Sequence, residues 1–449
     1  MLDRLARTIS RVPAWLRTVA AIVAFGGVAT WLTVSTWHGL RTSRLDVGLL
    51  TDFRDAIYYP VVAVRDGVNP YNVDTYYRHY PVGQEFPLYT PVHLLLHAPL
   101  VLFTFSTARA IAFGWNLALS LGLAVAALRL ARLRVSIEGI FGLGTLILLS
   151  DPGRFDLHTG QPTLMIVIGS YFALRSVARR AWPAVDRAMP PGAVSFALGA
   201  GALGVVWSKP TFAIPIVVLL VALGRPRLAV AGTIVGAVLS AVVLPFLIDA
   251  AGGVTQLVES WQKSARITSQ SLQSRLGSGL RIDAGNTFER ITHSHPSEGV
   301  AAIGGLVLLA TGAWLISRLH RRDPEGDREE LVITIACLLV LTSMYHVPYD
   351  YLLLVGPALM LARPRPSHPI AWPRRVRMWV LLLLLVPLID PLGWSPIHSV
   401  VGKSGFEWML GPTMLSTYVL TALGLCTWTA LRVTGQSKWA VSLKPSNTG

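Results

Sequence analysis

Two aspartates lie close together early in the chain, at positions where a carboxylate could act as a catalytic base. Asp52 directly precedes Phe53, and Asp55 follows three residues later, about one helical turn along. A carboxylate held among apolar groups at a membrane surface has a pKa suited to taking a proton from a hydroxyl group. A helix cap or a solvated loop would also explain these carboxylates. The residue types thus indicate general-base chemistry for Asp52 and leave the structural alternatives open.

Two histidines provide a second kind of acid–base group. His346 lies in LTSMYHVPYDYLLLVGP, between two apolar arms, and Asp350 follows it by four residues. The Asp350 carboxylate could hold the imidazole in one tautomer, although Pro348 argues against a regular helix between the two residues. His158, in RFDLHTGQPTLM, has a similar status. A lone histidine in such a place is more often structural than catalytic, so His346 is the reserve candidate for the base.

Basic side chains near the ends of apolar runs could bind a phosphate. Arginine binds phosphate through a bidentate fork, whereas lysine binds it as a point charge. Lys209 is the most informative, because WSKPTF places it between two short apolar runs and just before Pro210. Snorkelling of the ammonium to the membrane interface explains its position equally well. The arginines with the same potential are Arg154, Arg266, Arg275, Arg281 and Arg290.

Tyrosines are frequent in the segment that follows the first apolar run. They are Tyr58, Tyr59, Tyr71, Tyr76, Tyr77, Tyr80 and Tyr89. Tyrosine is favoured where one side is apolar and the other is wet, so an aromatic belt explains most of them. A few could stack on a sugar ring, but the sequence does not single out which ones.

The composition shows which kind of protein must position these groups. Apolar residues make up 52% of the 449, charged residues only 14%, and the mean hydropathy is +0.52. Soluble domains carry about 25% charged residues, so a cytosolic enzyme, a disordered chain and a secreted disulfide scaffold are excluded. Cys337 and Cys426 both lie in apolar runs, and no metal-ligand or nucleotide-binding motif is present. The chain is predicted to be an all-α polytopic membrane protein.

Apolar runs separated by basic residues predict about 12 transmembrane helices. The predicted spans are 15–38, 108–128, 137–150, 161–178, 193–207, 211–224, 228–248, 299–319, 331–345, 350–363, 377–393 and 412–432. The apolar stretch Phe86–Phe105 contains three prolines and two histidines, and we expect it to be re-entrant or interfacial. With that stretch not spanning, every short basic loop falls on one side, which the positive-inside rule makes cytoplasmic.

This topology gathers the remaining polar residues at the outer end of a single domain, 1–449. The domain contains a first outer loop, 39–107, which carries interfacial or re-entrant helices, and a second outer loop, 249–298. It ends in a cytoplasmic tail, 433–449. Both termini are expected in the cytoplasm, as are Arg321 and Arg375, with Asp52, Ser271 and Glu407 outside. The net charge of +15 is therefore explained by topology and not by nucleic-acid binding. Charges at membrane depth usually mark a site, which indicates a reaction centre on the outer face.

The order of several short motifs resembles glycosyltransferase family 87, whose members are membrane enzymes of the GT-C class that use polyprenyl-phosphate-linked sugars. The motifs are Asp52–Phe53 after the first span, G-x-x-x-Y-N (Gly67–Asn72), F-P-L-Y-T-P (Phe86–Pro91), F-D-x-x-x-G-Q (Phe155–Gln161), K-P (Lys209–Pro210) and His346. Each is weak alone, but together they extend over most of the chain and all lie on the predicted outer face.

The resemblance implies a GT-C-like fold and an inverting displacement with one aspartate base at the periplasmic side of a bacterial plasma membrane. Carried over by position, Asp52 is that base, and His346 orients acceptor or phosphate. The expected substrate-binding residues are Asp55, Tyr59, Asp156, His158, Gln161, Lys209, Arg266, Arg275 and Asp350. A lipid monophosphate needs less neutralisation than a diphosphate, so basic side chains suffice, and neither a metal nor another cofactor is expected.

The same resemblance indicates the substrates. Members of the family transfer mannose or arabinofuranose in actinobacterial envelopes, so the expected acceptor is an envelope glycolipid or polysaccharide. The mannosyltransferases often carry an Asn-Gln-Ser-x-x-G-like stretch, where this chain has SQSLQSRLG (Ser269–Gly277). The stretch thus departs from the mannosyltransferase pattern, and Asp52–Phe53 with G-x-x-x-Y-N is at least as similar to the arabinofuranosyl branch. We expect mannose first and arabinofuranose second. The alternative is a transporter or flippase of lipid-linked sugars, although no internal repeat of the kind such folds carry is evident.

Overall fold

The computed structural model describes residues 12–42, 50–87, 89–175, 191–271, 274–294, 296–322, 328–363, 373–390 and 412–440, and in these residues every regular element is helical. The elements up to residue 206 are α2 (Ala14–Thr42), the π-helical turn η1 (Phe53–Tyr58), α3 (Tyr59–Arg65), α4 (Val73–His79), α5 (Pro91–His97), the 3₁₀ turn η2 (Ala98–Leu102), α6 (Phe105–Leu130), α7 (Ile137–Leu149), α8 (Asp151–Thr159), α9 (Thr163–Arg175) and α10 (Pro191–Val206). They are followed by α11 (Pro210–Ala222), α12 (Pro226–Ala251), α13 (Val254–Gln270), α14 (Ala284–Thr292), α15 (Glu298–Arg321), α16 (Glu329–Ser343), the 3₁₀ turn η3 (Pro348–Leu354), α17 (Val355–Ala362), α18 (Arg374–Ile389) and α21 (Pro412–Ala440).

Within the described residues, each predicted span overlaps one helix, except 350–363, which overlaps the 3₁₀ turn η3 and helix α17. Five helices are long and apolar enough to cross a membrane: α2, α6, α12, α15 and α21. Several others are apolar but only 10–17 residues long, so the count of twelve spans stays a prediction. Helix α21 also continues to Ala440, into the segment predicted to be a cytoplasmic tail. A helix need not end where it leaves the apolar layer, because polar residues can continue its hydrogen bonding.

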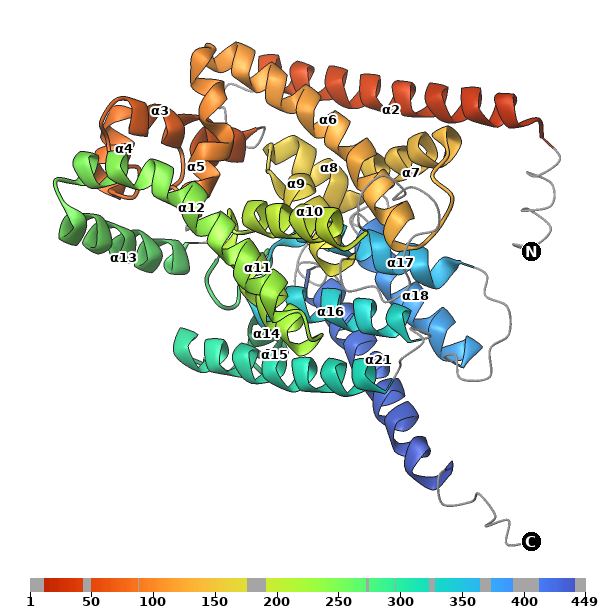
Figure 1. The fold of residues 1–449 in the computed structure, drawn as a ribbon. Helices are drawn as coiled ribbons and strands as arrows, with labels where there is room; N and C mark the ends of the chain where they lie inside the picture. The colour runs from red at the N-terminus through yellow and green to blue at the C-terminus, as the bar shows by residue number, and fades with distance from the viewer. Residues whose placement is uncertain are drawn as a thin grey trace, which may run out of the picture.

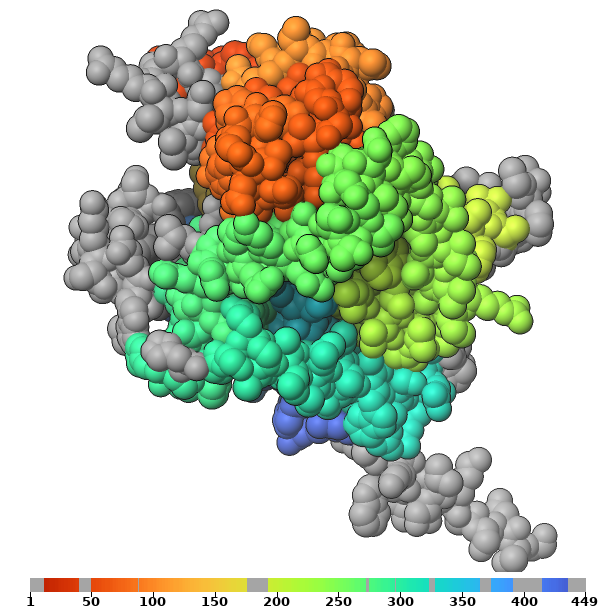
Figure 2. All heavy atoms as spheres, turned by 90° about the vertical axis from the view of Figure 1, so that its left-hand side faces the viewer, coloured from red at the N-terminus to blue at the C-terminus, as the bar shows by residue number. Residues whose placement is uncertain are grey.

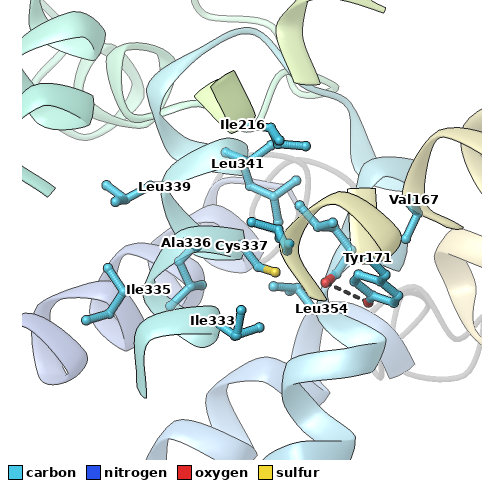
Figure 3. Close-up of a cluster of buried hydrophobic side chains, with 14 of the residues drawn as sticks. Val167, Tyr171, Ile216, Ile333, Ile335, Ala336, Cys337, Leu339, Leu341 and Leu354 are labelled. Atoms are coloured by element: carbon cyan, nitrogen blue, oxygen red, sulfur yellow. Dashed lines mark hydrogen bonds between the residues drawn. The ribbon is translucent and has the colours of Figure 1, made fainter. Parts of the chain in front are cut away.

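Helix α16 forms the centre of the hydrophobic core. Every side chain from Glu330 to Ser343 is buried, as expected for a helix that is apolar on all sides. Cys337 lies here, close to Leu354 and to Tyr171 of α9 (Figure 3). The Tyr171 hydroxyl donates a hydrogen bond of 2.9 Å to the main-chain carbonyl of Leu353, which ties α9 to the turn η3. Cys337 is thus a core residue, as its apolar surroundings in the sequence indicate.

Elements of the two predicted outer loops meet at one end of the helical bundle. In Figure 1, α3, α4 and α13 lie together at the left, whereas the beginnings of α2 and α18 lie at the right. The Lys263 ammonium of α13 is 2.5 Å from the Asp74 carboxylate of α4, which links the two loops directly. The arrangement agrees with loops that share one side of the membrane, and the sidedness itself stays a prediction. Glu407 lies outside the described residues.

The stretch Phe86–Phe105 does not form one continuous helix. Helix α5 ends at His97 and is followed by the 3₁₀ turn η2, so the helical part covers twelve residues in two pieces. About 20 helical residues are needed to cross a bilayer. The break is consistent with the expected re-entrant or interfacial element, and α5 packs against α12.

Candidate active site

The segment around Asp52 is held to the corner between α8 and α9. The main-chain N–H of Leu50 donates a hydrogen bond of 2.6 Å to the carbonyl of His158. Residues Phe53–Tyr58 then form a π-helical turn, a rare conformation that is common at functional sites. The Phe53 ring is fully buried and anchors the π-helical turn that follows Asp52. Asp52 starts this turn but does not cap it, so the capping alternative from the sequence is not used.

The Asp52 carboxylate is instead held by two glutamine side chains. Gln161 donates from its Nε2 to one carboxylate oxygen at 2.5 Å, and Gln84 donates to the other at 2.6 Å. Gln161 in turn accepts a hydrogen bond of 2.9 Å from the hydroxyl of Tyr89. Only 7% of Asp52 is exposed, so these contacts lie in a protected environment. The carboxylate has a fixed orientation and no direct cationic partner among the described residues.

A glycine explains how Gln161 comes so close to Asp52. Gly160 ends α8 in the left-handed conformation, with φ of 75°. A Cβ atom at this position would lie 2.6 Å from the Cβ of Phe53, which is far inside contact distance. The G-Q pair in the sequence therefore combines a turn that favours glycine with close approach of two chain segments.

Burial dominates the titration of Asp52. Loss of hydration raises the pKa of its carboxyl above the ordinary value, because burial penalises the charged form. The hydrogen bonds from Gln161 and Gln84 and the charge of Lys209 lower the pKa, and the charge of Asp55 raises it. A carboxylate with a raised pKa is a stronger base, which suits the removal of a proton from a hydroxyl group.

A second polar cluster surrounds Lys209, at the turn between α10 and α11. The ammonium lies 2.7 and 2.8 Å from the two oxygens of Asp350, and the side chains are almost completely buried. Asp350 also accepts hydrogen bonds from the ring Nδ1 of His346, at 2.9 Å, and from the N–H of Val347. The Nε2 atom of His346 is buried and has no hydrogen-bond partner among the described residues. Lys209 is thus not a snorkelling side chain but part of a buried network.

Aromatic rings and backbone contacts join the two clusters. The Lys209 ammonium is 5.0 Å from the ring centre of Tyr349, and this ring packs against Phe155 of α8 at 5.5 Å. Next to Tyr89, the hydroxyl of Thr90 donates to the carbonyl of Trp207. Figure 2 views the molecule from the end where α3 and α13 lie, and it shows a hollow in the surface between the α12–α13 segment and α15. The atoms at the bottom of this hollow have the colour of the α16–η3 region. Asp52 and the Lys209 cluster therefore form one candidate site.

Asp55 and Tyr59, both predicted to bind substrate, have partners within the first outer loop. The Asp55 carboxylate pairs with Arg54 at 2.6 Å and accepts a hydrogen bond of 3.0 Å from the N–H of Gly83. Tyr59 is half-buried and stacks on Phe105, with 5.6 Å between the ring centres. These contacts give both residues a structural role, and their binding role stays a prediction.

Asp156 and His158, also predicted to bind substrate, lie in α8 and not in an extended loop. Asp156 is fully buried, its carboxylate oxygens have no hydrogen-bond partner of good geometry among the described residues, and Thr163 is beside it. Burial raises the pKa of Asp156 well above the ordinary value. His158 is half-buried, and burial lowers the pKa of its ring, with a further contribution from Arg154. The polar stretch between two predicted spans therefore forms a short helix that carries buried polar groups.

The basic residues of the second outer loop differ in their surroundings. Arg266 and Arg275 are exposed, and their guanidinium groups have no ion pair among the described residues. Arg281 is buried and paired with Asp283 and with Glu298 of α15, and it also donates to the carbonyl of Ser274. Arg281 therefore organises the loop, whereas Arg266 and Arg275 are the arginines that stay available to a ligand.

Sequence reasoning missed several residues that build the site. They are Gln84, Tyr89, Asn116 and Tyr349. Tyr89 lies in the F-P-L-Y-T-P stretch, so its motif was a signal, but its contact with Gln161 links residues 72 positions apart. Among the described residues, no group of three or more His, Cys, Asp or Glu side chains could hold a metal ion.

Comparison with known proteins identifies the family of the chain. The sequence model of glycosyltransferase family 87 matches residues 87–343, which is more than half of the chain and includes Gln161 and Lys209. Asp52, His346 and Asp350 lie outside the matched region. No curated protein and no solved structure matches the chain. The resemblance seen in the sequence motifs is confirmed: the chain belongs to glycosyltransferase family 87 and is a membrane glycosyltransferase.

Proposed function

We propose that the chain transfers a sugar from a polyprenyl-phosphate donor to an envelope glycolipid or polysaccharide acceptor, with inversion, on the periplasmic face of a bacterial plasma membrane. Mannose is the first candidate for the sugar and arabinofuranose the second. The observation that carries the proposal is the buried Asp52 carboxylate, which two amide groups hold by hydrogen bonds. This carboxylate also lies close enough to Lys209 for the lysine charge to lower its pKa. A base and a cation at one site are what this displacement requires.

In the proposed reaction, the acceptor hydroxyl attacks C1 of the sugar from the face opposite the lipid phosphate. Asp52 takes the hydroxyl proton as the new C–O bond forms. The bond from C1 to the phosphate oxygen breaks, and its electron pair leaves with the polyprenyl phosphate. One displacement of this kind inverts the configuration at C1, and no covalent enzyme intermediate is needed.

Lys209 is proposed to stabilise the departing phosphate. Its ammonium has three hydrogens, and the two oxygens of Asp350 account for two hydrogen bonds. The third hydrogen is available to an incoming phosphate oxygen. Arg266 and Arg275 on the second outer loop are proposed to help, because both are exposed. With these cations, the transfer is proposed to need no metal ion.

Membership of a glycosyltransferase family favours the enzyme over a transporter of lipid-linked sugars. The test is to incubate the purified protein with polyprenyl-phosphate-mannose or polyprenyl-phosphate-arabinofuranose and envelope glycolipid acceptors, with and without EDTA. We expect transfer from one donor, resistance to EDTA, and opposite anomeric configurations in donor and product. Movement of intact donor across proteoliposome membranes without transfer would instead support the flippase. Retention of configuration would refute a single displacement.

A further inference from the structure

We infer that Gln84 and Gln161 are positioning residues that hold the Asp52 carboxylate in one orientation, and that Tyr89 holds Gln161 in turn. The sequence placed Gln161 among the substrate-binding residues and did not single out Gln84 or Tyr89. This inference rests on the proposed role of Asp52 as the base. It assigns these three residues to the alignment of that base instead of to contact with a sugar.

The first step of the argument is the geometry of the carboxylate. Each oxygen of Asp52 accepts one amide N–H, at 2.5 Å from Gln161 and at 2.6 Å from Gln84. Two donors on different oxygens prevent rotation of the carboxylate plane. Each carboxylate oxygen has two acceptor positions, so one position on each oxygen stays open to the acceptor hydroxyl. The base is thereby aimed before any substrate binds.

The second step concerns the direction in which the Gln161 amide points. Its Oε1 accepts the hydroxyl hydrogen of Tyr89 at 2.9 Å, so its Nε2 faces Asp52. A flipped amide would place its oxygen against a carboxylate oxygen, which is repulsive. Asn116 also donates to the main-chain carbonyl of Gln161, at 3.2 Å, and fixes the backbone at this corner. Tyr89 therefore determines whether Gln161 acts as a donor to the base.

The third step is electrostatic. The charged and titratable groups that face Asp52 are Asp55, Lys209, Tyr89, Tyr345 and Tyr349. Burial works against the ionised carboxylate, and the two amides favour it without adding a charge to the site. A cation in direct contact would stabilise the carboxylate more strongly and weaken it as a base. Because the base must be ionised to act, loss of either amide should move the acid limb of the pH–rate profile to higher pH.

The experiment compares Gln84→Met, Gln161→Met and Tyr89→Phe with wild type in the transfer assay. Methionine keeps the length of glutamine and removes the amide donors. We expect kcat to fall about 10- to 100-fold in the glutamine variants, because hydrogen bonds to charged groups carry effects of this size. The donor KM should change little, and the acid limb of kcat/KM should move to higher pH. Tyr89→Phe should produce the same shift with a smaller loss in kcat.

The matched control is Tyr58→Phe. It also removes one hydroxyl from the first outer loop, but that hydroxyl donates to the main-chain carbonyl of Phe103 and touches neither glutamine. We expect its acid limb to stay at the wild-type pH. Thermal unfolding of each variant in detergent identifies any loss of activity that comes from unfolding. The pH profile of kcat/KM is then measured on the folded fraction.

The outcomes separate this inference from the proposed function. Wild-type transfer that Asp52→Asn abolishes, together with unchanged acid limbs in Gln84→Met and Gln161→Met, would refute the positioning role and leave the function intact. A raised donor or acceptor KM without a pH shift would return Gln161 to substrate binding. If wild-type protein transfers no sugar, or Asp52→Asn transfers normally, the proposed function or its base fails before the glutamines are considered.

Discussion

Lys209 and Asp350 form a buried ion pair that connects the turn between α10 and α11 with the turn η3. The ammonium is 2.7 and 2.8 Å from the two carboxylate oxygens, and the side chains are 6% and 0% exposed. Two charges removed from water depend on one another, so loss of one partner leaves the other unpaired. The residue proposed to meet the donor phosphate is therefore also a structural residue.

The first prediction separates these two roles of Lys209. Lys209→Ala and Asp350→Asn should each destabilise the protein by about 3–5 kcal/mol, whereas the double variant Lys209→Met/Asp350→Leu should recover much of that loss. Thermal unfolding in detergent measures the stability, and initial rates at varied donor concentration measure donor use. We expect the double variant to be stable and still poor with donor. Normal donor kinetics in the double variant would leave Lys209 with the structural role alone.

The fold was largely predictable from the sequence because hydropathy is a local property. In the described residues, the twelve apolar runs overlap helical segments, including the short run that forms α7. The path of α8 was not predictable, because Asp151–Thr159 is polar in sequence and yet folds as a helix with Asp156 buried. Its surroundings are formed by η3, which lies about two hundred residues later in the chain.

The charged members of the candidate site could be predicted from their residue types, and Gln161 from the F-D-x-x-x-G-Q motif that contains it. Asp52, Lys209, His346 and Asp350 could be selected because charged or titratable groups in apolar surroundings are unusual. Gln84 could not, because a neutral amide in a polar loop has no such signal. Its importance comes from a contact with Asp52 across 32 residues, which only the folded chain reveals.

The second prediction concerns the arginines of the second outer loop. Arg281→Ala should destabilise the protein by about 3 kcal/mol, because it leaves Asp283 buried without its cation. Arg275→Ala should leave stability nearly unchanged, since its side chain is exposed, and should raise the donor KM if the phosphate proposal holds. Unfolding curves and donor titrations of the two variants test this contrast. A stable Arg281→Ala protein with a raised donor KM would reverse the assignment.

The third prediction tests the close approach at Gly160. Gly160→Ala combines a left-handed backbone, which costs about 1 kcal/mol for alanine, with a clash against Phe53 that costs about 1–3 kcal/mol. Gly67→Ala is the matched control, because Gly67 has a similar φ of 71° but no atom within 4 Å of an added Cβ. We expect both variants to lose stability and Gly160→Ala to lose more, with a fall in kcat. If Gly160→Ala and Gly67→Ala lost the same stability and the same activity, the clash at residue 160 would be relieved without a shift of Asp52.

The fourth prediction concerns topology. A cysteine at Ser271 should react with a membrane-impermeant maleimide in intact cells, whereas cysteines at Arg321 and Arg375 should react only after permeabilisation. The wild-type protein is the control, because Cys337 and Cys426 are buried and should label poorly. Labelling at position 271 only after permeabilisation would place the Asp52 site in the cytoplasm and overturn the outer-face reaction.

The last prediction distinguishes Asp52 from Asp55 as the base. Asp52→Asn keeps the size of the side chain but removes the proton acceptor. The new NH2 group then faces the NH2 group of Gln84 or Gln161, which is repulsive unless that glutamine amide rotates. The variant should fold, bind donor and lose turnover by about 10²- to 10⁴-fold, as is typical of a lost general base. Asp55→Asn removes the negative charge that pairs with the Arg54 guanidinium and should mainly reduce stability. The two variants are compared by kcat, donor KM and thermal unfolding under the same conditions. Near-normal turnover by Asp52→Asn, with an inactive but folded Asp55→Asn or His346→Ala, would move the base to Asp55 or across the site to His346.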